Sequence, residues 1–177
     1  MPTKQTTILT LYQSKRTVFT LNEIALITGE LNRNNLKARL NYYVRKGLLR
    51  SVRKGIYVKK EYEPFELATK IYTPSYISLE SVLEKEGVIF QHYSTIFVVS
   101  YLTRKISVDS LEIQYRKIKE RVLLSSKGII NFKNYSIASP ERAYLDAIYL
   151  YRNYHFDNPE VLDKKKINEI KPIYKND

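Results

Sequence analysis

The sequence predicts an α+β protein of two domains, residues 1–60 and 61–177. Three observations support this. The first third of the chain holds two helix-capping patterns and ends in a short basic segment that reads as a hairpin. Glu61-Tyr62-Glu63-Pro64 then breaks the basic run and reverses its charge, as expected at a domain boundary. Beyond it, helix and strand patterns alternate, and 12 of the 16 Tyr lie after residue 60. The second domain is therefore expected to be mixed α+β.

The N-terminal domain begins with two short helices. Residues 6–15 form the first, and Val18-Phe19 is a brief extended link. Thr20-Leu21-Asn22-Glu23 has the spacing of a capping box, in which the Thr hydroxyl and the Glu carboxylate each satisfy a backbone amide at the helix start. A second helix is expected from there to Gly29.

The next helix is the one on which the functional argument depends. Asn32 is the expected N-cap, so the helix starts at Arg33, with Leu31 and Leu36 placed to form a hydrophobic staple. Gly47 supplies the left-handed residue that ends it. Its apolar positions, Leu36, Leu40, Tyr43 and Val44, share one face. The opposite face is polar and basic and contains no carboxylate, which suits an acidic, hydrogen-bonding partner.

A basic hairpin follows this helix. Residues 48–52 and 56–60 are the expected strands, joined by a charged turn at Arg53-Lys54-Gly55. The order helix, short strand, helix, turn, helix, hairpin is that of a winged helix-turn-helix. The alternative interpretation is an ordinary amphipathic helix with a solvated Lys and Arg face.

The net charge of +12 is concentrated in the first domain. Residues 1–60 hold 13 Lys and Arg against two Glu, whereas residues 61–177 hold 17 against 16 acids. Phosphate backbone is the expected anion, and double-stranded DNA the expected partner. Base reading is assigned to Asn34, Lys37 and Asn41. Phosphate binding is assigned to the flanking residues Arg33, Arg45, Arg50, Arg53, Lys54, Tyr57 and Lys59.

The second domain is expected to contain several further elements. Helices are predicted from Ser78 to Gly87, from a start at Ser139-Pro140-Glu141 to Tyr154, and over residues 162–174. Strands are predicted over residues 94–103, 111–116, 121–125 and 129–137, the last interrupted by a turn at Lys133-Asn134. Residues 65–73 fit either helix or strand.

No enzymatic site, metal site or cofactor is predicted. The chain has no Cys, and its two His are isolated. A metal-dependent nuclease needs an acid and a Glu-x-Lys on adjacent strands, but the only Glu-x-Lys, Glu169-Ile170-Lys171, falls in an expected helix. Phosphate loops need clustered Gly, and the five Gly are scattered. No apolar run approaches the ~18 residues of a membrane span. We therefore expect a cytoplasmic protein without a membrane partner.

Two segments of the second domain resemble a known family. Tyr76-Ile77-Ser78-Leu79-Glu80-Ser81-Val82-Leu83 with Gly87-Val88-Ile89, and Ile137-Ala138-Ser139-Pro140-Glu141-Arg142-Ala143-Tyr144-Leu145-Asp146, are similar to the most recognisable segments of the AbiEi abortive-infection antitoxins of type IV toxin-antitoxin systems. With Lys54-Gly55-Ile56-Tyr57, the likeness spans most of residues 8–155.

The resemblance implies a bacterial repressor that binds the operator of its own operon and counters a neighbouring nucleotidyltransferase toxin, without a stable complex. It implies a DNA role for Lys54, Gly55 and Tyr57 and a structural role for Ser139, Pro140 and Glu141. Two alternatives remain open at this point: a winged-helix regulator whose second domain forms a homodimer or senses a ligand, and a metal-dependent nuclease.

Overall fold

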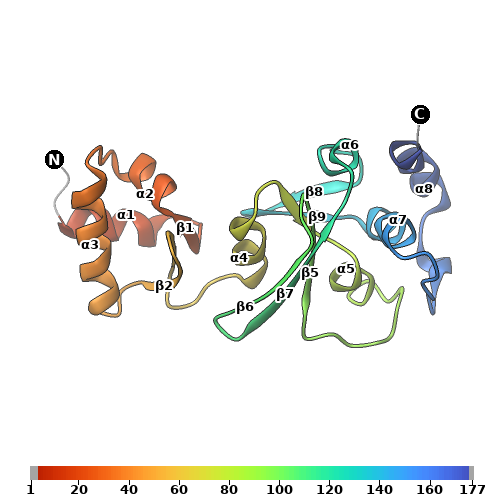
Figure 1. Cartoon of the computed structure of the whole chain (residues 1–177), viewed down its shortest axis with the longest axis horizontal. Coiled ribbons are helices and arrows are strands. Elements are labelled where there is room, and N and C mark those ends of the chain that lie inside the picture. Colours follow the sequence, from red (N-terminus) through yellow and green to blue (C-terminus); the bar gives the residue numbers. More distant parts are fainter. Residues whose placement is uncertain (1–3, 176–177) are drawn as a thin grey trace. The chain divides into compact units, whose positions relative to one another are not determined.

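The computed structural model describes residues 4–175, with side chains from Thr7 onward. The chain forms two compact units, the first ending at Ile71 and the second beginning at Tyr72 (Figure 1). Both mix helices with strands, and the second contains a six-stranded mixed sheet. The predicted α+β class is thus confirmed.

Four helices and a small sheet form the first unit. The helices are α1 (Lys4–Gln13), α2 (Leu21–Thr28), α3 (Arg33–Arg45) and α4 (Pro64–Ile71). The strands β1 (Val18–Thr20), β2 (Arg50–Arg53) and β3 (Ile56–Val58) pair antiparallel in the order β1-β3-β2. The helices and strands predicted over residues 6–58 are all present, and residues 65–71, left open between helix and strand, are helical.

Local capping explains where these helices begin and end. The Thr20 hydroxyl accepts a hydrogen bond from the Glu23 amide, and the Glu23 carboxylate accepts one from the Thr20 amide, so the predicted capping box is confirmed. The Asn32 side chain caps α3 as predicted by accepting from the amides of residues 34 and 35. Gly47 has the predicted left-handed backbone, with φ +69°.

One predicted contact at the start of α3 is absent. Leu36 is fully buried, but Leu31 is 95% exposed, so the staple between these two residues does not form. Polar contacts hold the turn before α3 instead: the Glu30 carboxylate accepts from the Asn32 amide at 3.1 Å. The turn is therefore fixed without an apolar contact, and Leu31 points away from the core.

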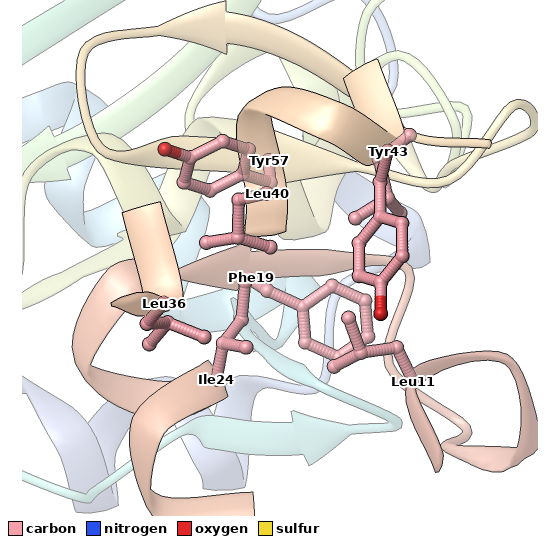
Figure 2. Close-up of a cluster of buried hydrophobic side chains, with 8 residues drawn as sticks. Leu11, Phe19, Ile24, Leu36, Leu40, Tyr43 and Tyr57 are labelled. Atoms are coloured by element: carbon pink, nitrogen blue, oxygen red, sulfur yellow. The ribbon is translucent and has the colours of Figure 1, made fainter. Parts of the chain in front are cut away.

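One apolar cluster holds the first unit together. The side chains of Leu11, Phe19, Ile24, Leu36, Leu40, Tyr43, Leu49 and Tyr57 converge between the helices and the sheet (Figure 2). Each is at most 7% exposed, so α3 has a buried face and an opposite face turned to solvent.

Helix α4 belongs to the first unit, although the expected boundary at residue 61 lies before it. The Glu66 carboxylate accepts from the Thr17 amide at 3.0 Å and from its hydroxyl at 2.6 Å. The Lys70 ammonium lies 2.6 Å from the Glu23 carboxylate. These contacts attach α4 to β1 and α2, so the compact unit continues to Ile71.

A sheet with the strand order β6-β7-β5-β4-β9-β8 organises the second unit (Figure 1). Its strands are β4 (Ser75–Ile77), β5 (Ile96–Ser100), β6 (Arg104–Val108), β7 (Leu111–Lys117), β8 (Ile129–Phe132) and β9 (Tyr135–Ala138). Two neighbouring pairs, β5 with β7 and β4 with β9, are parallel and the others antiparallel. Four of these strands were predicted; β4 and β6 were not.

Short helices accompany this sheet. They are α5 (Glu80–Leu83), α6 (Glu120–Leu123), α7 (Pro140–Leu150) and α8 (Lys164–Ile170), with 3₁₀ turns η1 (Pro159–Val161) and η2 (Lys171–Tyr174). The predicted start of α7 is confirmed, because the Ser139 hydroxyl accepts from the Arg142 amide and Pro140 occupies the first turn. The helix ends at Leu150, four residues before the predicted end.

Two predictions in this unit are wrong. Residues 120–123 form helix α6 rather than a strand. The consecutive residues Val122 and Leu123 are both buried, so the segment lacks the alternation of buried and exposed side chains that a half-buried strand shows. Helix α5 spans only Glu80–Leu83, and Ser78 does not cap it. The Ser78 hydroxyl instead donates to the Asp146 carboxylate at 2.8 Å, so it is committed to the core.

Candidate nucleic-acid interface

The outward face of α3 is a continuous polar surface. The predicted base-reading residues Asn34, Lys37 and Asn41 are all exposed, as is Ala38 between them. Arg33 and Arg45, predicted to bind phosphate, are exposed near the two ends of the helix. The structure therefore places five of the ten predicted residues at exposed positions along α3.

Buried polar contacts fix α3 from its side. Arg39 donates to the Thr7 hydroxyl at 2.8 Å and to the Glu30 carboxylate at 3.1 Å, and both side chains of the ion pair are only 13% exposed. Arg39 thus anchors α3 to α1 and to the turn before α3. Its charge is neutralised within the protein and does not contribute to the outward face.

A shallow cavity of ≈ 400 Å³ runs along α3 beside this face. It is lined by Asn35, Ala38, Arg39, Tyr42 and Arg45. Of these lining residues, only Arg45 was predicted from the sequence to contact DNA. The Ala38 side chain is shorter than its neighbours on this face, so a flat ligand can approach the helix backbone closely at this position.

The β2–β3 hairpin carries the next group of predicted residues. Arg50 and Lys54 are exposed, and Arg53 is half-buried. The hairpin register shifts between Ser51 and Arg53, and Gly55 in the turn has φ +79°, a conformation that favours glycine. Lys54 therefore lies at the tip of a tight turn.

Tyr57 is not placed to bind phosphate. It is 7% exposed and belongs to the apolar cluster of the first unit, where its ring lies beside Leu40 (Figure 2). Burial raises the pKa of its phenol. All three residues of β3 are buried, because β3 is the central strand of its sheet. Because no residue of β3 is exposed, the strand has no alternation of polar and apolar side chains that could have shown Tyr57 to point inward. Its role is packing.

Lys59 is likewise engaged inside the unit. Its ammonium donates to the backbone carbonyls of Tyr12 at 3.2 Å and Ser14 at 2.7 Å, and lies 5.9 Å from the centre of the Phe19 ring. Burial lowers the pKa of Lys59. This residue therefore links the end of α1 to the end of β3, and these contacts argue against its assignment to phosphate binding.

The electrostatics of this region are strongly one-sided. Residues 31–60 include ten Lys and Arg and no Asp or Glu. The two acids of the preceding segment are paired internally: Glu30 with Arg39, and Glu23 with Arg16 and Lys70. Burial alone would raise the pKa of Glu23, but hydrogen bonds from Lys70 and Thr20 outweigh it and lower the pKa. Neither carboxylate offsets the positive charge of the α3 face or the hairpin.

In the second unit, the two family-like segments meet in a buried polar network. Arg142 and Asp146 are each 0% exposed, with Nε and Oδ1 3.3 Å apart. Asp146 also accepts hydrogen bonds from the hydroxyls of Tyr76, Ser78 and Tyr174. Arg142 also donates to the carbonyls of Lys127 and Val122 and to the Tyr76 hydroxyl. The i,i+4 spacing of Arg142 and Asp146 was the only signal in the sequence that could have predicted this pair.

The structural role expected of Ser139, Pro140 and Glu141 agrees with the start of α7. Ser139 caps the helix, Pro140 occupies its first turn and Glu141 is 5% exposed. The Glu141 Oε2 atom is buried without a hydrogen-bond partner among the described residues.

Among residues 4–175, no group of three or more His, Asp or Glu side chains is arranged to hold a metal ion. Glu169-Ile170-Lys171 lies at the junction of α8 and η2, not on a strand as a Glu-x-Lys metal site requires. No helix within the described part of the chain is long and apolar enough to cross a membrane.

No family model matches the chain, and no curated protein matches it significantly.

Proposed function

We propose that the first unit is a winged helix-turn-helix that binds duplex DNA, with α3 in the major groove and the β2–β3 hairpin against the phosphate backbone. The observation that carries this proposal is the outward face of α3, which combines Asn, Lys and Arg side chains with no carboxylate and is the face opposite the core. The three-stranded antiparallel sheet and the helix order fit such a domain.

The roles of the residues follow from the groups they present. Asn34 and Asn41 each carry an amide that can pair with the N6 and N7 edge of adenine, and Lys37 can donate to guanine. Their spacing supports this, because seven residues of helix extend ~10 Å, about three base-pair steps. Arg33, Arg45, Arg50 and Lys54 are proposed to contact phosphates, with Arg53 at the edge of this group.

We further propose that the protein is a cytoplasmic repressor of its own operon and the antitoxin of a type IV toxin-antitoxin system, opposed to a nucleotidyltransferase toxin. The support is the resemblance of residues 76–89 and 137–146 to AbiEi antitoxins, together with the direct contact of these segments through Tyr76, Arg142 and Asp146. The two segments that resemble the family are far apart in the sequence but contribute to the same core.

The DNA proposal is tested with purified full-length protein and a labelled duplex taken from upstream of its own coding sequence. A scrambled duplex of equal length and composition is the control DNA, and both are titrated by fluorescence anisotropy across a salt series. We expect tighter binding to the upstream duplex and a steep loss of affinity with salt, because each phosphate contact releases counterions. Weak binding that is equal on both duplexes would contradict the proposal.

Asn34→Ala with Asn41→Ala tests base reading in the same assay. We expect a loss of ~1–3 kcal/mol per base contact on the upstream duplex and no change on the scrambled one. Asn168→Ala, an exposed amide on α8, is the matched control. An equal loss on both duplexes would remove the base-reading assignment while leaving DNA binding intact.

The antitoxin proposal predicts that a nucleotidyltransferase is encoded beside the gene, and co-expression of the two proteins tests it. Restored growth supports the proposal. The support is stronger if the double variant Arg33→Ala with Arg45→Ala, which should bind DNA weakly, also restores growth. Failure to restore growth, together with tight operator binding, would favour a regulator without an antitoxin role.

A further inference from the structure

The two edges of the six-stranded sheet differ in charge. Strand β6 forms one edge and includes the exposed cations Arg104 and Lys105. Strand β8 forms the other and consists of Ile129-Ile130-Asn131-Phe132, with no charged residue. Charged side chains, Lys above all, are a usual means of preventing an edge strand from pairing with another chain. The β6 edge has this protection and the β8 edge lacks it.

The face of the sheet beside the β8 edge is apolar and exposed. Ile130 is opposite Ile137 and Phe132 is opposite Tyr135, and opposed residues of an antiparallel pair share a face. Ile130 is 51% and Phe132 is 45% exposed. The rings of Phe132 and Tyr135 lie 5.5 Å apart. Large side chains therefore continue to the rim of the sheet, where nothing in the described chain buries them fully.

Backbone geometry selects the residue that faces outward. Phe132 and Tyr135 close a two-residue turn, so their backbone groups face each other across the hairpin. In an antiparallel ladder these directions alternate along the strand, so Asn131 directs its amide and carbonyl to the open side. Its side chain lies on the opposite face from Ile130, with Oδ1 accepting from the Ser136 hydroxyl at 3.0 Å. The Asn131 side-chain NH₂ group is then directed away from the Ser136 hydroxyl.

We propose that β8 pairs antiparallel with β8 of a second copy of this chain, about a two-fold axis at Asn131. In this register Asn131 is opposite Asn131 of the second copy, and the two residues exchange backbone hydrogen bonds. Ile130 is opposite the second copy's Phe132, and the reverse pair forms at the same time. Both apolar pairs lie on the same face, so the exposed apolar surfaces of the two hairpins become continuous.

The charge pattern identifies the occupant as a second copy. A two-fold interface uses the same surface on both copies, so that surface must be complementary to itself. The β8 sequence is apolar, polar, apolar about Asn131 and has no charged residue. The neighbouring cation, Lys133, lies 5.2 Å from the centre of the Phe132 ring, beyond the end of β8, so it is displaced from the axis at Asn131 and does not face its own copy. The same pairing at β6 would bring Arg104 and Lys105 of both copies into one interface. A strand of four residues gives a small contact, so the dimer depends on concentration. The inference does not depend on DNA binding.

Disulfide crosslinking tests the register directly, because the natural chain has no Cys. We expect full-length Asn131→Cys to form a covalent homodimer under mild oxidation, since opposed residues have Cα atoms within the range that a disulfide spans. Ile130→Cys and Phe132→Cys should each crosslink poorly alone, because neither residue is opposite its own equivalent. A mixture of the two variants should crosslink efficiently, because residue 130 of one copy is opposite residue 132 of the other. Lys105→Cys, exposed on the β6 edge, is the control for random collision. Crosslinking of Lys105→Cys as fast as Asn131→Cys would overturn the proposal, and efficient crosslinking of Ile130→Cys alone would overturn the register.

Sedimentation velocity of the cysteine-free protein gives an independent measurement. We expect a monomer–dimer equilibrium whose dissociation constant rises at least about tenfold in Ile130→Lys, because the new charge would face an apolar side chain twice per dimer. Ile148→Lys, which adds the same charge at an exposed position on α7, should leave the equilibrium unchanged. Thermal unfolding of both variants checks that the fold is retained. A wild-type protein that stays monomeric at all concentrations, or an equilibrium insensitive to Ile130→Lys, would contradict the proposal.

Discussion

Arg142 and Asp146 form an ion pair that is entirely shielded from solvent, and five other residues complete its hydrogen bonds. The pair lies on α7, and its partners come from β4 and the residue after it, from α6 and the segment that follows it, and from η2. A buried charge costs several kcal/mol unless it is paired and hydrogen-bonded. Here Arg142 and Asp146 neutralise each other, and their other partners supply the remaining hydrogen bonds. This network therefore makes the assembly of the second unit conditional on the correct placement of all four segments.

Removing one member of the pair should be severely destabilising. We expect Asp146→Ala to lower the free energy of unfolding by ~3–5 kcal/mol, because it leaves the Arg142 guanidinium buried without its counter-ion. Chemical denaturation measures this. Glu112→Ala, which breaks the exposed pair with Lys105, is the control and should cause no measurable change. A small effect of Asp146→Ala would show that the pair is hydrated in solution.

Gly128 should tolerate no side chain. Its φ is +70°, and an added Cβ would lie 2.7 Å from Ile170 Cδ1 and 2.8 Å from Arg142 Cβ. We expect Gly128→Ala to destabilise the protein by ~2–4 kcal/mol, from backbone strain combined with the clash. Gly55→Ala separates these contributions, since Gly55 has a similar φ of +79° with open space around it. It should cost only ~1 kcal/mol. Equal losses in the two variants would mean that Ile170 moves aside.

The sequence predicted the first unit well because its signals are local. Asn32, the Thr20 and Glu23 pair, and Gly47 each act within one turn of the backbone, so their effects hold in any fold that contains those helices. Leu31 was misplaced because a staple also depends on the direction in which the chain enters the helix. That direction is set by Glu30 and its contact with Arg39.

The second unit was predicted less completely because its determinants are distant in sequence. Strand β4 has three residues, too few for a periodic signal, and exists because β5 and β9 lie on either side of it. Ser78 resembled a helix cap, but its hydroxyl binds Asp146, 68 residues later. Tyr57 and Lys59 were assigned to DNA by residue type, whereas Tyr57 packs in the apolar cluster and Lys59 donates to two backbone carbonyls. Such roles cannot be derived without the topology.

The ion pair network of Glu23 should make the first unit sensitive to acid. The folded-state pKa of Glu23 is lowered, so its ionised form contributes stability above the ordinary pKa of 4.5. That contribution disappears as the pH falls through the folded-state pKa. We expect Glu23→Gln, which retains a hydrogen-bonding cap, to reduce stability near neutral pH and to flatten the decline below pH ~5. Thermal unfolding across this range measures both effects. A variant with the same acid limb as the wild type would exclude Glu23 as its source.

Lys54 and Lys59 should separate DNA binding from folding. Lys54 is exposed at the hairpin tip, so Lys54→Ala should lower DNA affinity and reduce the salt slope by ~1 without changing thermal stability. Lys59 donates to two backbone carbonyls, so Lys59→Ala should lower the melting temperature. When DNA binding is measured well below its melting temperature, Lys59→Ala should have the same salt slope as the wild type. Interchanged results would restore the original assignment of Lys59 to phosphate.

Ala38 makes a sharper prediction about the DNA that α3 reads. It lies at the centre of the outward face between Asn34 and Asn41, where its methyl group can pack against the 5-methyl group of thymine. With two asparagines that favour adenine, this predicts a preferred site rich in A·T pairs. Replacing thymine by deoxyuridine in that site removes only the methyl group. We expect affinity to fall by ~0.8 kcal/mol, roughly fourfold, for a contacted thymine.

The same substitution becomes specific when it is combined with a protein variant. Ala38→Ser retains the size of the side chain approximately but replaces its apolar contact, so this variant should be nearly insensitive to the loss of the thymine methyl. The double-mutant comparison of two proteins with two duplexes isolates that single contact from effects on DNA shape. Lys165→Ala on α8 serves as a protein control whose sensitivity should equal that of the wild type. If Ala38→Ser loses as much affinity on the deoxyuridine duplex as the wild type does, α3 binds DNA with a different face or register, even if the protein binds its operator tightly.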